Sequence, residues 1–177
     1  MRPILKRLDV GANERREIVQ DEWKYSGEDS ADMAQPGSSA NSALIVPFAE
    51  FRKWLDHPGR LGIRLSPADA VEDLGDDVKR LSLVAVEFPS AGEGRGYSQG
   101  RLLRSARFGF TGELRAVGAG VKQDLLFIMA RCGFDAFELA AGQKVEEALK
   151  AFGRYTVAYQ PAEPLASIKQ QRYFAAT

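Results

Sequence analysis

From residue 60 onward, short apolar runs alternate with patterns of helical period. The runs typical of strands span residues 61–65, 83–88, 114–117 and 136–139. The helical patterns lie near residues 70–81, 98–108, 121–132 and 144–152. Strand–helix units with such short connections favour parallel neighbours joined by right-handed crossovers. The sequence therefore predicts an α/β domain with a mostly parallel sheet of at least four strands.

Two arrangements of these strand–helix units remain open. An open sheet is the first expectation, and half of a (β/α)8 barrel would have the same local sequence. Because a half barrel exposes apolar edges, this alternative also favours a homodimer.

The N-terminal region has a different pattern. Its short apolar pieces in residues 2–25 are separated by charges and suit a small hairpin or edge strands. Residues 26–42 read SGEDSADMAQPGSSANS, which offers a core almost nothing to bury and predicts a mobile loop. Residues 43–46 are a further strand candidate. We divide the chain into an N-terminal arm and loop at 1–42, an α/β domain at 43–160 and a C-terminal tail at 161–177.

Each of the four strands carries one charged residue in or at the end of its apolar run: Arg64, Glu87, Arg115 and Glu138. Because parallel sheets are usually covered on both faces, an unpaired charge there costs free energy. The signs alternate along the chain, so we expect Arg64 to pair with Glu87, or Arg115 with Glu138. The alternative is that each side chain reaches solvent at its strand end.

Two glycine-bearing loops follow candidate strands and form the candidate site. Residues 88–101 contain GEGRGYSQGR, and residues 117–124 read VGAGVKQD. Ligands of open α/β sheets bind at the carboxyl ends of the strands, where helix N-termini favour anions. We expect Ser98 to cap the first helix. The candidate anion-binding residues are Arg95, Gly96, Tyr97, Ser98, Arg101, Gly118, Gly120 and Lys122, with Glu87, Glu93 and Arg115 as supporting charges.

The same loops also fit a purely structural use. Their glycines would then only permit tight turns, Ser98 would only cap its helix, and Arg95 would pair with Glu93 or Glu87.

Composition narrows the function classes. The 177 residues include 24 Lys and Arg against 24 Asp and Glu, and this zero net charge argues against nucleic acid or a membrane surface as a partner. One cysteine and the absence of a long apolar segment indicate a cytoplasmic protein. One histidine and one cysteine give no zinc or cluster site, and the glycine spacing does not match the dinucleotide or phosphate-loop fingerprints. We therefore expect no metal and no cofactor.

Six segments occur in order within residues 61–160: LGIRLSP, LVAVEFP, GRGYSQGRLLR, FGFTGELRAVG, ARCGFDAFEL and VAYQ. In these segments the chain resembles domain-of-unknown-function family 934 (DUF934). The resemblance implies a bacterial protein often described as an oxidoreductase of sulfite reduction. The family usually has Asp where this chain has Glu93, and often Asp where it has Ala119. The transferable positions are therefore Arg95, Tyr97, Ser98 and Arg101.

A self-sufficient redox enzyme needs a cofactor, a metal or a thiol pair, and the sequence has no recognisable site for any of them. We therefore expect an accessory or small-oxyanion-binding protein of sulfite reduction or sulfur assimilation. Its partners would be a sulfite or nitrite reductase, or a small anion. One alternative is a small enzyme acting on a phosphorylated or sulfonated metabolite, with Arg95 and Lys122 holding the anion and Glu87 or Asp124 moving a proton. The other is a protein-interaction module.

Overall fold

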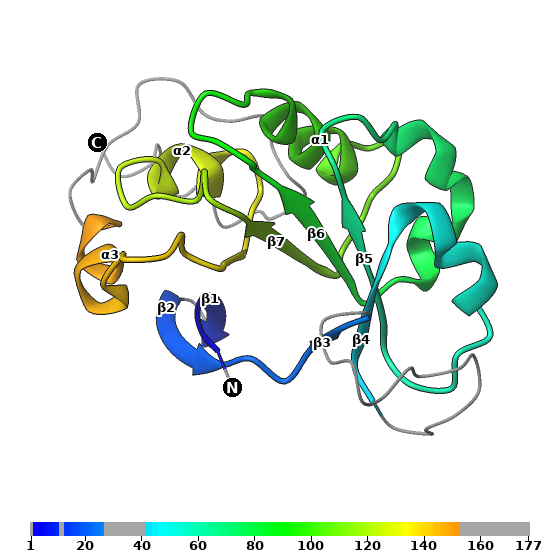
Figure 1. Ribbon diagram of the computed structural model, residues 1–177, viewed down its shortest axis with the longest axis horizontal. Coiled ribbons are helices and arrows are strands. Elements are labelled where there is room, and N and C mark those ends of the chain that lie inside the picture. The colour runs from blue at the N-terminus through cyan, green and yellow to red at the C-terminus, as the bar shows by residue number, and fades with distance from the viewer. Residues whose placement is uncertain (1, 11–12, 27–41, 153–177) are drawn as a thin grey trace.

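The computed structural model describes residues 2–10, 13–26 and 42–152, and within them eight strands form one sheet in the order β2-β1-β8-β7-β6-β5-β4-β3. The strands are β1 (Pro3–Val10), β2 (Asn13–Gln20), β3 (Lys24–Tyr25), β4 (Leu44–Pro47), β5 (Leu61–Leu65), β6 (Leu83–Glu87), β7 (Glu113–Val117) and β8 (Ala136–Phe137). Strands β3 to β8 are parallel, and the β1–β2 hairpin joins β8 antiparallel. The sheet curls into a half barrel (Figure 1). The mostly parallel sheet, the N-terminal hairpin and the half-barrel alternative are thus confirmed.

Short helices cover the outer side of the curl (Figure 1). They are η1 (Phe48–Trp54), η2 (Val71–Arg80), α1 (Arg95–Arg104), α2 (Leu126–Arg131) and α3 (Val145–Ala151). Element η2 is a 3₁₀ helix that kinks at Gly75, where φ is 53° and ψ is −137°. Such a conformation suits a residue without Cβ. Helix α2 begins later than its apolar pattern suggests, because residues 122–125 form a turn closed by the Leu125 amide on the Lys122 carbonyl.

Alternate residues of each central strand enter two different cores. Val84 and Val86 of β6 pack in the larger core between the sheet and the helices. Leu83 and Ala85 of the same strand face the inside of the curl, where they pack with Trp23. Burial on both faces explains why this strand is apolar without interruption up to Glu87.

Residues 21–25, here called the strap, cross the inside of the curl from the hairpin at one end of the sheet to β3 at the other (Figure 1). Trp23 of the strap lies over Gly62 on β5, where an added Cβ would lie 3.1 Å from the Trp23 ring. Glycine at this position therefore makes room for the indole. The N-terminal segment is in this way part of the same sheet as residues 44–137. Residues 27–41 of the mobile loop predicted over residues 26–42, and the predicted tail at 161–177, lie outside the described residues.

The charge-pair prediction is confirmed for one pair and wrong for the other. Arg64 and Glu87 lie on neighbouring strands, with Nη2 and Oε1 2.8 Å apart. Arg115 does not pair with Glu138. It lies in the middle of β7, and its fully buried guanidinium contacts Asp21 of the strap. Glu138 lies beyond the end of β8 and instead binds Arg2 and Tyr25.

No helix among the described residues has both the length and the apolar character needed to cross a membrane.

Candidate functional site

The two glycine-bearing loops lie against each other at the carboxyl edge of the sheet. The Gly120 amide donates to the Phe88 carbonyl at 2.7 Å. Gly118 has φ of 106°, and a Cβ added there would lie 2.6 Å from the same carbonyl oxygen. Both glycines are therefore required for this close approach. The strand ends of β6 and β7 thus bring residues 88–101 and 117–124, here called the outer rim loops, into one place.

Helix α1 begins at Arg95, three residues before the predicted start, and Ser98 is not its N-cap. The N-cap residue is Gly94, and the side chain of Glu93 before it accepts a hydrogen bond from the Arg95 amide at 3.0 Å through Oε1. A carboxylate at this position also complements the helix dipole. Ser98 is instead an exposed residue inside the helix.

Gly96 and Gly100 allow α1 to lie close to the sheet. A Cβ added at Gly96 would lie 2.5 Å from the Phe88 ring, and one at Gly100 would lie 2.6 Å from the Phe134 ring. The ring of Tyr97 packs edge-on against Phe88 with centroids 5.1 Å apart. Burial raises the pKa of Tyr97, and its electrostatic interactions with Cys132 and Asp124 raise it further. Gly96, Gly100 and Tyr97 therefore support the packing of α1 against the sheet, and the Tyr97 hydroxyl stays neutral at physiological pH.

Three cationic side chains of the outer rim loops are exposed: those of Arg95, Arg101 and Lys122. Within the described residues, none of the three forms an ion pair or a side-chain hydrogen bond. Arg104, at the far end of α1, is the opposite case, because it binds the Asp135 carboxylate and the carbonyls of Gly133, Phe110 and Gly112. The outer rim loops therefore keep their positive charges available for a ligand.

A second set of charged side chains lies at the same edge, on the inside of the curl. This inner rim cluster consists of Arg2, Tyr25, Arg64, Glu87 and Glu138. Arg2 belongs to it because β1 is antiparallel to β8 and so starts where β8 ends.

Two hydrogen-bonded groups make up the inner rim cluster. Glu138 accepts from Arg2 Nη1 at 2.8 Å and from the Tyr25 hydroxyl at 3.1 Å. Arg64 donates to Glu87, as described above, and its guanidinium carbon lies 6.0 Å from the centroid of the Tyr25 ring. The Arg2 guanidinium carbon lies 4.9 Å from the same centroid. Tyr25 therefore joins the two groups into one cluster.

Burial, followed by the charge of Glu138, raises the pKa of Tyr25 well above its usual range. The phenol therefore stays protonated and acts as a hydrogen-bond donor. Sequence reasoning picked out Glu87 but missed Arg2 and Tyr25, because only the return of the N-terminal segment across the curl brings them there.

Arg115 lies away from the rim and has a structural role. Its guanidinium binds Asp21 through two hydrogen bonds and Glu113 through a third at 2.9 Å, and the side chain is 0% exposed. Lys6 neutralises the other oxygen of Glu113 at 2.6 Å. Arg115 and Asp21 attach the strap to β7 and are both buried, whereas Lys6 reaches solvent.

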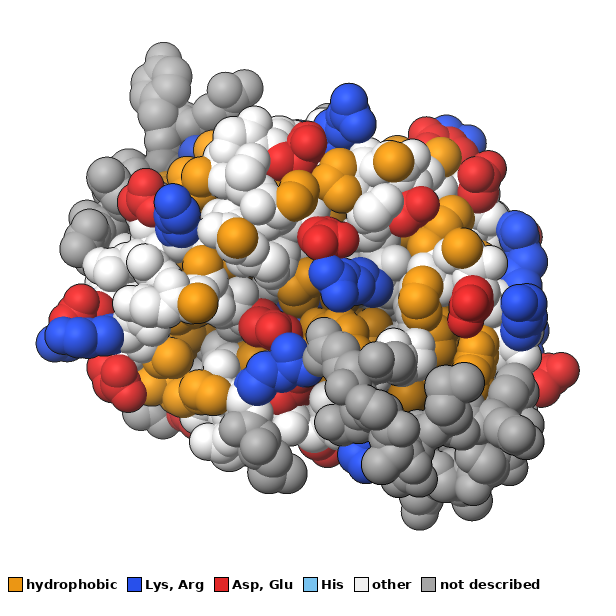
Figure 2. Space-filling view, viewed as in Figure 1, with side chains coloured by type: hydrophobic (Ala, Val, Ile, Leu, Met, Phe, Trp, Pro, Cys, Tyr) orange, Lys and Arg blue, Asp and Glu red, His pale blue; other side chains and the backbone are white. Residues whose placement is uncertain are grey.

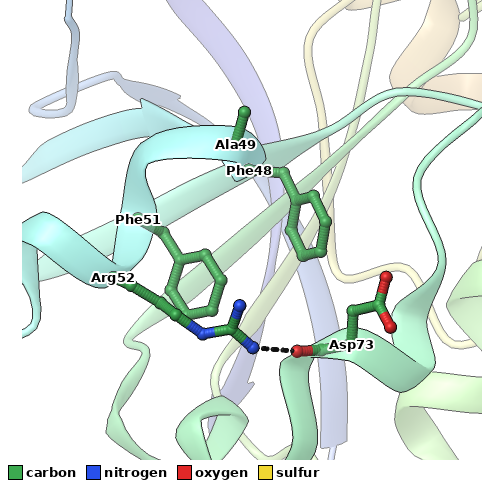
Figure 3. Close-up of a pocket in the computed structure, with 5 residues that line it drawn as sticks. All are labelled: Phe48, Ala49, Phe51, Arg52 and Asp73. Carbon is green, nitrogen blue, oxygen red and sulfur yellow. Dashed lines mark hydrogen bonds between the residues drawn. The ribbon is translucent and has the colours of Figure 1, made fainter.

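A shallow hollow of about 190 Å³ lies beside the end of β4 and contains none of the predicted site residues. Phe48, Ala49, Phe51, Arg52 and Asp73 line it (Figure 3). The Arg52 guanidinium closes one side by donating to the Asp73 carbonyl at 2.6 Å (Figure 3). None of these lining residues belongs to the outer rim loops or to the inner rim cluster.

Among the described residues, no group of three or more His, Cys, Asp or Glu side chains is placed to hold a metal ion. His57 Nε2 lies 3.2 Å from the Ser42 carbonyl, in the loop before β5. Cys132 is buried, and burial raises the pKa of its thiol. Figure 2 shows acidic and basic side chains interspersed on the face it presents, in keeping with the balanced composition.

Among proteins with curated descriptions, none matches the chain. A family model described as a bacterial protein of unknown function, DUF934, matches residues 62–167. The matched segment contains β6, β7, both outer rim loops and three members of the inner rim cluster. Because the match spans more than half of the sequence, the chain belongs to the DUF934 family.

Proposed function

We propose that this protein binds a small oxyanion between its outer rim loops and serves as an accessory protein of bacterial sulfite reduction. The observation that supports the proposal is the backbone contact between the two loops, each of which carries an exposed cationic side chain at the carboxyl edge of the sheet. Arg95 and Lys122 come from different loops, and both are exposed and free of ion pairs within the described residues.

The chemistry of this edge suits an oxyanion with several acceptor atoms. A guanidinium offers a fork of N–H donors and an ammonium adds a point charge, and both form strong bonds to charged oxygens. Glu93 limits the affinity, because its carboxylate already occupies the Arg95 amide and repels a second anion. We therefore expect selective binding of modest strength.

The assignment to sulfite reduction rests on the family resemblance. Sulfite and sulfate are compact anions with three or four oxygens, which a guanidinium from one loop and an ammonium from the other could bind together. An accessory role would consist of holding or delivering such an anion to a reductase that performs the electron transfer.

Isothermal titration with sulfite, sulfate and phosphate tests the proposal. We expect saturable binding that falls at least tenfold when Arg95→Ala and Lys122→Ala are combined. Arg107→Ala is the matched control, since this exposed arginine follows the opposite end of α1 and should leave binding unchanged. Equal affinity in the double variant would refute the site.

One observation favours the enzyme alternative as a second candidate. Glu87 stands at the same edge with one carboxylate oxygen paired to Arg64, and the side chain is 26% exposed. A carboxylate that reaches solvent can act as a general base when it lies within hydrogen-bond distance of a substrate. Turnover of a phosphorylated or sulfonated metabolite that is lost in Glu87→Gln would establish this function instead.

A further inference from the structure

We propose that the inner rim cluster is a second binding site, and that its ligand is a small zwitterion of the α-amino acid type. The site lies on the inside of the curl, whereas the proposed oxyanion site lies on the outer rim loops. The two proposals therefore depend on different residues and can fail independently.

The charge balance of the cluster selects this class of ligand. The cluster holds two guanidinium groups, Arg2 and Arg64, and two carboxylates, Glu87 and Glu138. A simple anion that approaches either arginine also meets a carboxylate within 2.8 Å of that arginine, and this repulsion lowers its affinity. A ligand with one negative and one positive group avoids this repulsion, because each of its charges finds an opposite partner.

Arg64 and Glu87 keep unused hydrogen-bonding capacity for such a ligand. Their one hydrogen bond joins Nη2 to Oε1 at 2.8 Å. Within the described residues, the remaining N–H groups of Arg64 and the Oε2 atom of Glu87 have no hydrogen-bond partner. Both side chains reach solvent, with 39% and 26% of their surfaces exposed. The ligand carboxylate would accept from Arg64, and its ammonium would donate to Glu87.

The positions of Arg64 and Glu87 relative to each other also favour an α-amino acid. An α-amino acid carries its carboxylate and ammonium on one carbon, and Arg64 and Glu87 place complementary groups side by side on neighbouring strands. Tyr25 lies between Arg2 and Arg64 and fills the space on that side. Buried Val117 of β7 separates the strands that carry Glu87 and Glu138. The proposed ligand is therefore one that contacts Arg64 and Glu87 together, with its two charged groups on one carbon.

Binding of the full-length protein to a panel of the common L-α-amino acids tests the inference. Backbone amide NMR shifts of residues 64–66 and 85–88 would report it. Propionate and ethylammonium serve as matched probes, because each lacks one of the two charges of alanine. We expect at least one amino acid to bind tenfold more tightly than either single-charge probe. If no amino acid binds more tightly than both probes, the inference is wrong.

Substitutions of Glu87 and Arg64 then test whether the amino acid contacts these two residues. In Glu87→Gln, the selected amino acid should bind at least tenfold more weakly, while binding of propionate stays the same or rises. The matched control is the Arg60–Glu22 pair, which also has a 2.8 Å contact but precedes the amino end of β5, so Glu22→Gln should change nothing. Arg64→Lys provides a second variant should Glu87→Gln fail to fold, and it should weaken binding by removing the guanidinium fork. Unchanged amino acid binding in a folded variant of either residue would overturn the assignment.

Discussion

Asp21 and Arg115 are 94 positions apart in the chain, yet they meet through two hydrogen bonds of 2.8 and 3.0 Å on the inside of the curled sheet. This pair attaches the strap to the middle of β7. It thereby fixes Tyr25, four residues after Asp21, at the rim where Arg64 and Glu138 lie. The geometry of the inner rim cluster thus depends on a contact that lies outside the cluster.

Removing one member of this buried pair should strongly destabilise the protein. Asp21→Ala leaves part of the Arg115 guanidinium without a partner, which typically costs about 3–5 kcal/mol. Urea unfolding measures the free energy of unfolding. Glu22→Gln, which changes an exposed side chain next to it, should alter that free energy by less than about 0.5 kcal/mol. Equal effects of the two substitutions would contradict the structural role of Asp21.

The contact between the outer rim loops predicts a large difference between two glycines. Gly118→Ala places a Cβ 2.6 Å from the Phe88 carbonyl at φ of 106°, so the protein should lose about 2 kcal/mol or more of stability. Gly92 has no atom within 4 Å of an added Cβ, so Gly92→Ala should be nearly neutral. Thermal unfolding of both variants makes the comparison. Loops that lie apart in solution would give two equally mild effects.

Glu93 should oppose oxyanion binding while it stabilises α1. Glu93→Gln removes the negative charge beside the Arg95 amide, so sulfite or phosphate should bind several-fold more tightly. The same change should cost about 0.5–1 kcal/mol of stability, because the helix loses a charged cap at its positive end. Titration and urea unfolding of one variant measure both effects. Weaker anion binding in Glu93→Gln would indicate that the anion binds elsewhere.

The raised pKa of Tyr25 predicts a specific loss of stability at alkaline pH. In the unfolded chain the phenol ionises near pH 10, whereas in the folded protein burial and Glu138 hold it in the neutral form. As pH rises past about 10, the unfolded state therefore releases this proton first, and the free energy of unfolding falls. Tyr25→Phe should remove that part of the decline, as urea unfolding between about pH 9 and 11 can measure. An identical pH dependence in both proteins would contradict the burial of the phenol.

The central strands could be predicted from sequence because each one is marked by a short run of consecutive apolar residues. The strand at residues 61–65 has the predicted bounds, and β6 and β7 differ from their predictions by one residue each. Uninterrupted apolar runs are the direct consequence of burial on both faces. The Arg64–Glu87 pair could be predicted for a related reason, because sequential parallel strands lie side by side. Glu87 lies two positions beyond Ala85, the residue opposite Arg64, and so is on the same face of the sheet.

The remaining contacts depend on how the sheet closes. Asp21, Tyr25 and Arg2 lie in a segment whose pattern shows only edge strands, and nothing near them in sequence indicates Arg115 or Glu138. Their positions follow from the pairing of β1 with β8 and of β3 with β4. These pairings join segments that are far apart in the sequence, so no local pattern indicates them. The capping role of Glu93 was also missed, since Ser98 is the commoner capping residue type.

Backbone amide NMR spectra of the labelled protein during a sulfite titration test the proposed function most directly. Binding at the outer rim loops predicts saturable shifts concentrated in residues 90–98 and 118–123, which disappear when Arg95→Ala and Lys122→Ala are combined. No saturable shift, or shifts confined to other parts of the chain, would contradict the proposal that this edge of the sheet holds an oxyanion.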